Sequence, residues 1–193
     1  IIAWISGPKA RDHAGAVVEL KQLIDNAARL GLPSLLSGGP RRNETVEAYS
    51  KTMAEVMPYA ADQGLKIAMK PHGVDSPEVL ECVERVKHSH FSLWYDAGNM
   101  IHYTGEDPVK ALHPLAPHVT GFCAKDCAEK GGEVTLQFGD GKVDFAGVFR
   151  VLKKAGFQGP IMIDCTGRGA TPDEVTRLAI RNREFLRNAF ARS

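Results

Sequence analysis

Chemically reactive side chains recur at one kind of place in this sequence, at the ends of short apolar segments. Lys70 and His72 follow one such segment, Asp96 ends the next, and Lys125 and Asp164 lie at the ends of two later ones. Carboxylates and an imidazole accept protons, and an ammonium stabilises negative charge that develops on an oxygen. The pattern predicts acid–base chemistry on a small molecule, and the candidate catalytic residues are Lys70, His72, Asp96 and Asp164.

Further polar side chains near these segment ends are the expected substrate contacts: Arg41, Arg42, Asn99, Lys125 and Arg168. Arg41 and Arg42 follow two glycines and precede an expected helix start, where backbone amides favour an anion. A solvated surface pair explains the two arginines equally well. Any one of these side chains alone has an ordinary structural explanation. Their recurrence at consecutive segment ends favours the functional interpretation.

The elements that position these residues alternate along the chain. The apolar segments lack the in-and-out alternation of a half-exposed strand, which is typical of buried parallel strands. An amphipathic, helix-like stretch follows each of them, and Ser76, Asp107, Asp144 and Thr171 are the expected N-caps of four helices. The predicted strands are residues 1–6, 33–37, 66–70, 92–96, 119–124 and 160–164.

Composition narrows the protein class. The 193 residues carry a formal net charge of +1, with 44% hydrophobic and 24% charged residues. These values exclude a disordered chain and argue against a protein that binds nucleic acid through bulk charge. No apolar run reaches the roughly 20 residues that a membrane span needs. Four cysteines are too few for a disulfide scaffold of this size, so we expect a reduced, cytoplasmic setting.

Two architectures combine parallel strands with helices in this way. An open doubly wound sheet that binds a dinucleotide needs a glycine fingerprint after its first strand, and residues 6–9 do not supply one. A (β/α) TIM-type barrel places reactive residues at the carboxyl ends of its strands, as found here. We therefore predict an α/β fold of the TIM-barrel type. It is incomplete in this chain, because about six strand–helix units cannot close an eight-strand ring.

Several motifs, each weak alone, occur in an order that resembles the sugar-phosphate isomerase/epimerase family with a xylose-isomerase-like barrel. They lie at residues 66–73, 95–99, 105–108, 119–126, 139–145 and 159–164. The resemblance covers nearly the whole chain and implies one barrel domain over residues 1–193. On this mapping residues 1–5 correspond to the third strand, so we expect the first two strands to be missing from the N-terminal side.

The resemblance also implies a divalent metal site, and here the chain departs from the family. The family's Glu, Asp, His and Glu ligands correspond to Lys70, Asp96, Cys123 and Asp164, and a further histidine corresponds to Asn99. We favour a metal-free site in which Lys70 forms an ion pair with Asp96 or Asp164. The alternative is a metal held by His72, Asp96, Cys123 and Asp164, with zinc favoured over magnesium or manganese because of the thiolate.

Three functional classes follow from the resemblance. The first is a sugar or sugar-phosphate isomerase or epimerase that removes a proton next to a carbonyl, with a lyase on a keto-sugar as a variant. The second is a carbohydrate-binding or inactive relative that kept the barrel without the metal. The third, a nucleic-acid enzyme of the same fold, is disfavoured by the balanced charge. The expected partner is a small sugar or polyol, without nucleic acid or membrane. Unpaired sheet edges would allow a homo-oligomer.

Overall fold

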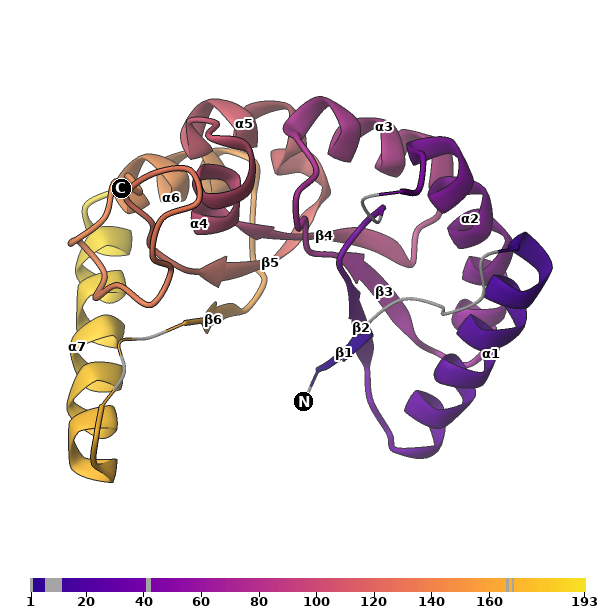
Figure 1. The fold of residues 1–193 in the computed structure, drawn as a ribbon, viewed down its shortest axis with the longest axis horizontal. Coiled ribbons are helices and arrows are strands. Elements are labelled where there is room, and N and C mark those ends of the chain that lie inside the picture. The colour runs from indigo at the N-terminus through magenta and orange to yellow at the C-terminus, as the bar shows by residue number, and fades with distance from the viewer. Residues whose placement is uncertain (1, 6–11, 41–42, 166, 168) are drawn as a thin grey trace. The chain divides into compact units, whose positions relative to one another are not determined.

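The computed structural model describes residues 2–5, 12–40, 43–165, 167 and 169–193. Six strands, β1 to β6, are hydrogen-bonded in chain order, and the described registers are parallel. A helix follows each strand (Figure 1). The chain divides into two compact units, Ile1–Trp94 and Tyr95–Ser193, and each is described below by itself.

The first unit contains β1 (Ala3–Ile5), α1 (His13–Arg29), β2 (Ser34–Ser37), α2 (Val46–Asp62), β3 (Lys66–Met69), α3 (Ser76–Val86) and the first part of β4 (Phe91–Asp96). Ile5 pairs with Ser37, Ser37 with Met69 and Met69 with Leu93. The strand ends are therefore level, and the residues that follow them leave one edge of the sheet. α1 packs on α2, and α2 packs on α3.

The second unit continues from the end of β4. Its elements are α4 (Ala97–Asn99), the π-helical turn η1 (Met100–Thr104), α5 (Pro108–Leu115), the 3₁₀ turn η2 (Ala116–His118), β5 (Val119–Ala124), α6 (Phe145–Lys154), β6 (Ile161–Ile163) and α7 (Pro172–Ala191). The buried Tyr95 hydroxyl donates to the Pro108 carbonyl at 2.5 Å, and burial raises the pKa of this phenol. This bond fixes the end of β4 against the start of α5.

Most of the predicted helix starts are confirmed. Asp107, Asp144 and Thr171 each accept a backbone N–H at the N-terminus of α5, α6 and α7, and Thr171 forms a full capping box. The prediction for α3 is wrong by one residue, because Asp75 is the N-cap and Ser76 is the first helical residue. Both side chains are good caps, and only the backbone conformation distinguishes the two positions.

The fold class is confirmed as part of a parallel TIM-type barrel with six strand–helix units. β1 and β6 stand at the two ends of the strand order, so each has one neighbouring strand among the described residues. None of the helices in the described ranges combines the length and apolar character that crossing a bilayer requires.

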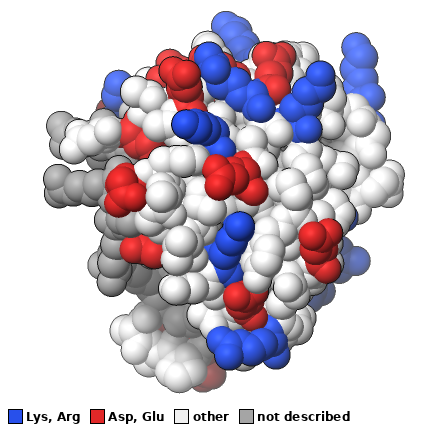
Figure 2. Space-filling view, turned by 90° about the vertical axis from the view of Figure 1, so that its right-hand side faces the viewer, with Lys and Arg blue, Asp and Glu red and all other residues white. Residues whose placement is uncertain are grey.

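Surface charge is mixed on the face of the first unit that carries α1 and α2. Figure 2 shows Lys and Arg side chains interspersed with Asp and Glu side chains over this face. The mixture agrees with the balanced sequence charge, whereas binding to a phosphate backbone needs clustered positive charge.

Candidate active site at the ends of β4, β5 and β6

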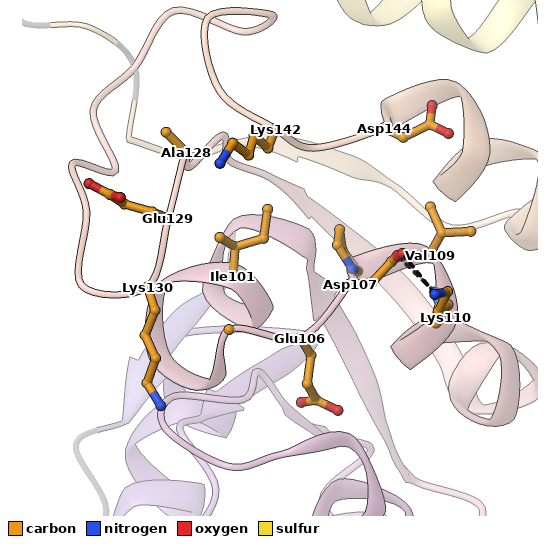
Figure 3. Close-up of a pocket in the computed structure, with 12 residues that line it drawn as sticks. Ile101, Glu106, Asp107, Val109, Lys110, Ala128, Glu129, Lys130, Lys142 and Asp144 are labelled. Atoms are coloured by element: carbon orange, nitrogen blue, oxygen red, sulfur yellow. Dashed lines mark hydrogen bonds and ion pairs between the residues drawn. The ribbon is translucent and has the colours of Figure 1, made fainter.

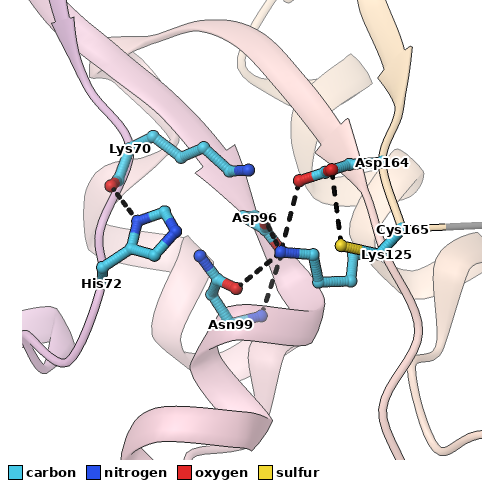
Figure 4. Close-up of polar contacts among 7 residues, drawn as sticks. All are labelled: Lys70, His72, Asp96, Asn99, Lys125, Asp164 and Cys165. Atoms are coloured by element: carbon cyan, nitrogen blue, oxygen red, sulfur yellow. Dashed lines mark hydrogen bonds and ion pairs between the residues drawn. The ribbon is translucent and has the colours of Figure 1, made fainter. Parts of the chain in front are cut away.

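An ammonium group lies among three oxygen acceptors in the second unit. Lys125 Nζ lies 3.2 Å from Asp96 Oδ2, 3.2 Å from Asp164 Oδ2 and 3.0 Å from Asn99 Oδ1 (Figure 4). The number of these acceptors equals the number of N–H donors that an ammonium carries. Lys125 is 5% exposed and Asp96 is fully buried, so water contributes little to solvating either charge. The two opposite charges therefore stabilise each other.

The parallel strands bring these groups together. Asp96 is the last residue of β4, Lys125 directly follows β5, and Asp164 directly follows β6. The pairing of Ala124 with Ile163 sets Lys125 and Asp164 level with each other. Each side chain alone is an unremarkable strand-end residue, and the common edge of the sheet makes them a single site.

Gly98 allows the lysine stem to pass close to α4. A Cβ built on Gly98 would lie 2.7 Å from Lys125 Cγ and 2.8 Å from the Lys125 carbonyl oxygen. Both distances are too short for any real side chain. The glycine in the sequence Asp96-Ala97-Gly98-Asn99 is therefore a requirement of the site's packing.

Asp96 has two contacts that fix its carboxylate in different directions. Its Oδ1 accepts the backbone N–H of Asn99 at 3.0 Å and so caps the short helix α4. Its Oδ2 faces Lys125. The capping bond thus orients the carboxylate toward the ammonium and also places the Asn99 side chain beside it.

Asp164 is the more accessible of the two carboxylates. Its side chain is 26% exposed, and its Oδ1 accepts from the Cys165 thiol at 3.5 Å while Oδ2 faces Lys125. Cys165 has a φ of 52°, in the left-handed region that non-glycine residues rarely adopt. The chain therefore turns sharply directly after Asp164, at the edge of the site.

Asp126 was not expected to have a role, and it anchors the loop that follows β5. Its fully buried carboxylate accepts four backbone N–H groups, from Cys127, Gly139, Gly141 and Val143, at 2.8–3.2 Å. The glycine-rich pattern at 139–145 signalled this close approach, since a Cβ on Gly141 would collide with the carboxylate. Lys125 and Asp126 thus have separate roles, one in the site and one in the loop.

In the first unit, His72 is oriented by the backbone. Its Nδ1 lies 2.9 Å from the Lys70 carbonyl oxygen, and its ring makes an edge contact with Trp4 at 4.8 Å between centroids. A carbonyl only accepts, so Nδ1 carries the proton, and Nε2 of the neutral imidazole then has the lone pair. Lys70 is 5% exposed.

The structure brings together Asp96, Asn99, Lys125 and Asp164 of the predicted site. Lys70 and His72 belong to the other unit, so the predicted ion pair between Lys70 and a carboxylate remains a prediction. The expected contacts Arg41, Arg42 and Arg168 lie outside the described residues.

The residues at the expected metal positions do not fit a divalent ion. Lys70 offers no lone pair while it is protonated, and both Asp96 and Asp164 contact the ammonium of Lys125. The remaining position is the buried thiol of Cys123, a soft ligand. Within the described ranges, no group of three or more His, Cys, Asp and Glu side chains is arranged to hold a metal.

A cavity of about 640 Å³ also lies in the second unit, between the 105–110 segment and the loop after β5 (Figure 3). Its acidic residues include Asp107 and Asp144, whose carboxylates are engaged as helix caps. None of the predicted site residues lines it. The buried charges therefore favour the strand-end cluster as the chemical site.

Comparison with known proteins places this geometry in a family. Over 149 residues the chain is 25% identical to an inosose dehydratase of Clostridium botulinum (strain Alaska E43 / Type E3), which covers 66% of this chain and 49% of that protein. The chain thus spans about half the length of this curated relative.

Two solved structures share the fold. One is a D-psicose 3-epimerase from Clostridium cellulolyticum H10 with D-tagatose, with a TM-score of 0.78, 14% identity and coverage of 95% of this chain and 74% of that one. The other is an IOLI protein with a bound zinc atom, with a TM-score of 0.72, 14% identity and coverage of 99% and 75%.

The model of one protein family, described as "Xylose isomerase-like TIM barrel", matches residues 2–189. This range contains every predicted strand except its first residue and extends into α7. The chain therefore belongs to the xylose isomerase-like TIM barrel family.

Proposed function

We propose that this chain acts on a sugar or sugar phosphate as an isomerase or epimerase that removes a proton from the carbon next to a carbonyl group. The observation that carries the proposal is the ammonium of Lys125, held at the strand ends by Asp96, Asp164 and Asn99. A fixed, desolvated positive charge stabilises the negative charge that such a reaction creates.

The carbonyl oxygen of the substrate binds to Lys125 in place of the Asn99 amide oxygen. Asn99 is the neutral acceptor of the three, and hydrogen bonds from an ammonium to carboxylates are the stronger ones. Asp96 and Asp164 keep the ammonium in place during this exchange. Substrate hydroxyl groups donate to the carboxylate oxygens, which are acceptors only when ionised.

Asp164 is the first candidate for the base, because it is partly exposed whereas Asp96 is fully buried. The base takes the proton from carbon, and the C–H electron pair forms the enolate double bond as the carbonyl oxygen becomes negative. Return of the proton to the opposite face gives an epimer, and its return to the former carbonyl carbon gives an isomer. His72 is the second candidate, with its lone pair on Nε2.

A lyase reaction is the second candidate function, favoured by the inosose dehydratase relatives. It begins with the same proton removal. The enolate then expels a hydroxyl group from the next carbon, and this group leaves as water after protonation. The groups that the isomerase proposal uses at the first step serve the lyase equally.

The test follows proton removal directly. A panel of ketoses, their phosphates and an inosose is incubated with the protein in D₂O, and proton NMR follows the signal next to the carbonyl. We expect exchange of that proton for deuterium with at least one compound, and a fall of about 100-fold or more in Asp164→Asn. Lys110→Met, whose side chain is 85% exposed, is the matched control.

The outcomes separate the alternatives. Exchange with formation of a new sugar supports the isomerase or epimerase, and loss of water supports the lyase. Saturable binding without any exchange would identify a carbohydrate-binding relative and overturn the enzymatic proposal.

A further inference from the structure

The ammonium of Lys125 lies where its charge does the work expected of a metal ion. The family resemblance implies a divalent cation held in part by the carboxylates at positions 96 and 164. In this chain both carboxylates contact Lys125 Nζ at 3.2 Å. A second cation bound to the same oxygens would lie within a few ångströms of the first, and like charges at that distance repel strongly at low dielectric.

The local packing holds Lys125 in this position. Its stem passes Gly98 without room for a methyl group, and its ammonium has an acceptor for each N–H donor. Withdrawal of the ammonium would leave Asp96, which is fully buried, without this opposite charge. Leaving a buried carboxylate uncompensated is costly, so the pair favours the closed arrangement.

We propose that Lys125 is the built-in cation of this site and replaces the divalent metal of the family. It holds Asp96 and Asp164 together, and under the function proposed above it is also the group that polarises the substrate carbonyl. The charge is +1 rather than +2, and it comes from a donor of hydrogen bonds instead of a Lewis acid. Binding to an oxygen therefore depends on the protonation of one side chain.

The protonated ammonium can be observed directly. In protein labelled with ¹⁵N-lysine, exposed NH₃⁺ groups exchange their protons with water too fast to detect near neutral pH. A buried NH₃⁺ with three acceptors exchanges slowly and gives a signal. We expect such a signal from Lys125, and we expect it to disappear in Lys125→Met. Lys70→Met is the matched control, because Lys70 is the other lysine in the described ranges that is 5% exposed.

Titration with metal then tests the replacement. One equivalent of paramagnetic Mn²⁺ is expected to leave the Lys125 signal unbroadened, and one equivalent of Zn²⁺ is expected to leave its position unchanged. Asp96→Asn and Asp164→Asn are each expected to speed the proton exchange of Lys125 and weaken the signal. Broadening by stoichiometric Mn²⁺, a shift with Zn²⁺, or the absence of a protected Lys125 signal would overturn the proposal.

These measurements are made on the wild-type protein without turnover. Failure of the NMR result therefore bears on Lys125 alone, whereas failure of the deuterium exchange assay bears on the proposed function. If Lys125→Met does not fold, Lys125→Arg gives the same assignment, because arginine carries no lysine label.

Discussion

Gly98 and Lys125 touch so closely that position 98 admits no side chain. The missing Cβ would lie 2.7 Å from Lys125 Cγ, and the neighbouring backbone at 2.8 Å leaves no direction of escape. We predict that Gly98→Ala displaces the ammonium from Asp96 and destabilises the fold by about 1–3 kcal/mol, as overpacking of a buried site does. Urea unfolding measures the loss, and the proton exchange of the Lys125 ammonium measures the displacement.

Gly167→Ala is the control for this substitution. A Cβ there would meet its nearest neighbour, Leu178 Cδ1, at 3.4 Å, which is an ordinary contact. We expect it to leave both measurements close to those of the wild type. Equal effects at the two positions would contradict the argument from close packing.

The pair of Lys125 and Asp96 predicts a strong energetic coupling. Lys125→Met leaves Asp96 buried without its opposite charge, and we expect the free energy of unfolding to fall by about 3–5 kcal/mol. Adding Asp96→Asn removes the isolated charge, so the double variant should recover about 0.5–3 kcal/mol relative to additive losses. A double-mutant cycle in urea measures this term.

The control for the cycle is an exposed ion pair. Lys110 and Asp107 lie 3.9 Å apart, and the lysine side chain is 85% exposed. Lys110→Met should change the free energy of unfolding by less than about 0.5 kcal/mol. Additive losses for Lys125 and Asp96 would show that the two groups do not stabilise each other.

The loop after β5 depends on the carboxylate of Asp126. Asp126→Asn replaces one acceptor oxygen by an amide that points its own hydrogens at backbone N–H groups. We expect a loss of about 2–4 kcal/mol, because several buried donors lose their partner. Hydrogen exchange of the Gly139, Gly141 and Val143 amides should become faster. Asp140→Asn, at an exposed position of the same loop, should change neither.

The four thiols should differ in reactivity. Burial raises the pKa of Cys82 to about 11, so at pH 8 this thiol stays protonated and unreactive. Cys123 and Cys127 are also buried, whereas Cys165 is partly exposed. Iodoacetamide at pH 8 should therefore modify Cys165 first, as mass spectrometry would show. Modification of Cys82 at the same rate would contradict the burial of that thiol.

The strand ends and most helix caps could be predicted from the sequence because each depends on local patterns. The apolar runs located all six strands to within three residues at each end, and Asp144 and Thr171 signalled their helices. The π-helical turn at Met100–Thr104 has no such signal. It depends on how the chain leaves α4 and meets the loop after β5, where Gly131 donates to the His102 carbonyl.

The composition of the candidate site was predicted better than its arrangement. The sequence shows that Lys125 and Asp164 end neighbouring strands, but it does not show how far a four-carbon stem reaches or where it points. Lys70 was therefore expected to be the cation, while the printed ion pairs involve Lys125. The space left at Gly98 decides this direction, and it becomes visible only after α4 and β5 have packed.

The opposite charges of Lys125 and Asp126 have a consequence for how the chain selects its strand pairing. A slip of β5 by one residue would exchange the faces of these two side chains. Asp126 would then stand beside Asp96 and Asp164, and three carboxylates would meet without a cation, while Lys125 would face the backbone donors of the loop. The misaligned chain would be penalised at two places at once. Adjacent residues of opposite sign thus act as a proofreading device for folding, written into two consecutive positions.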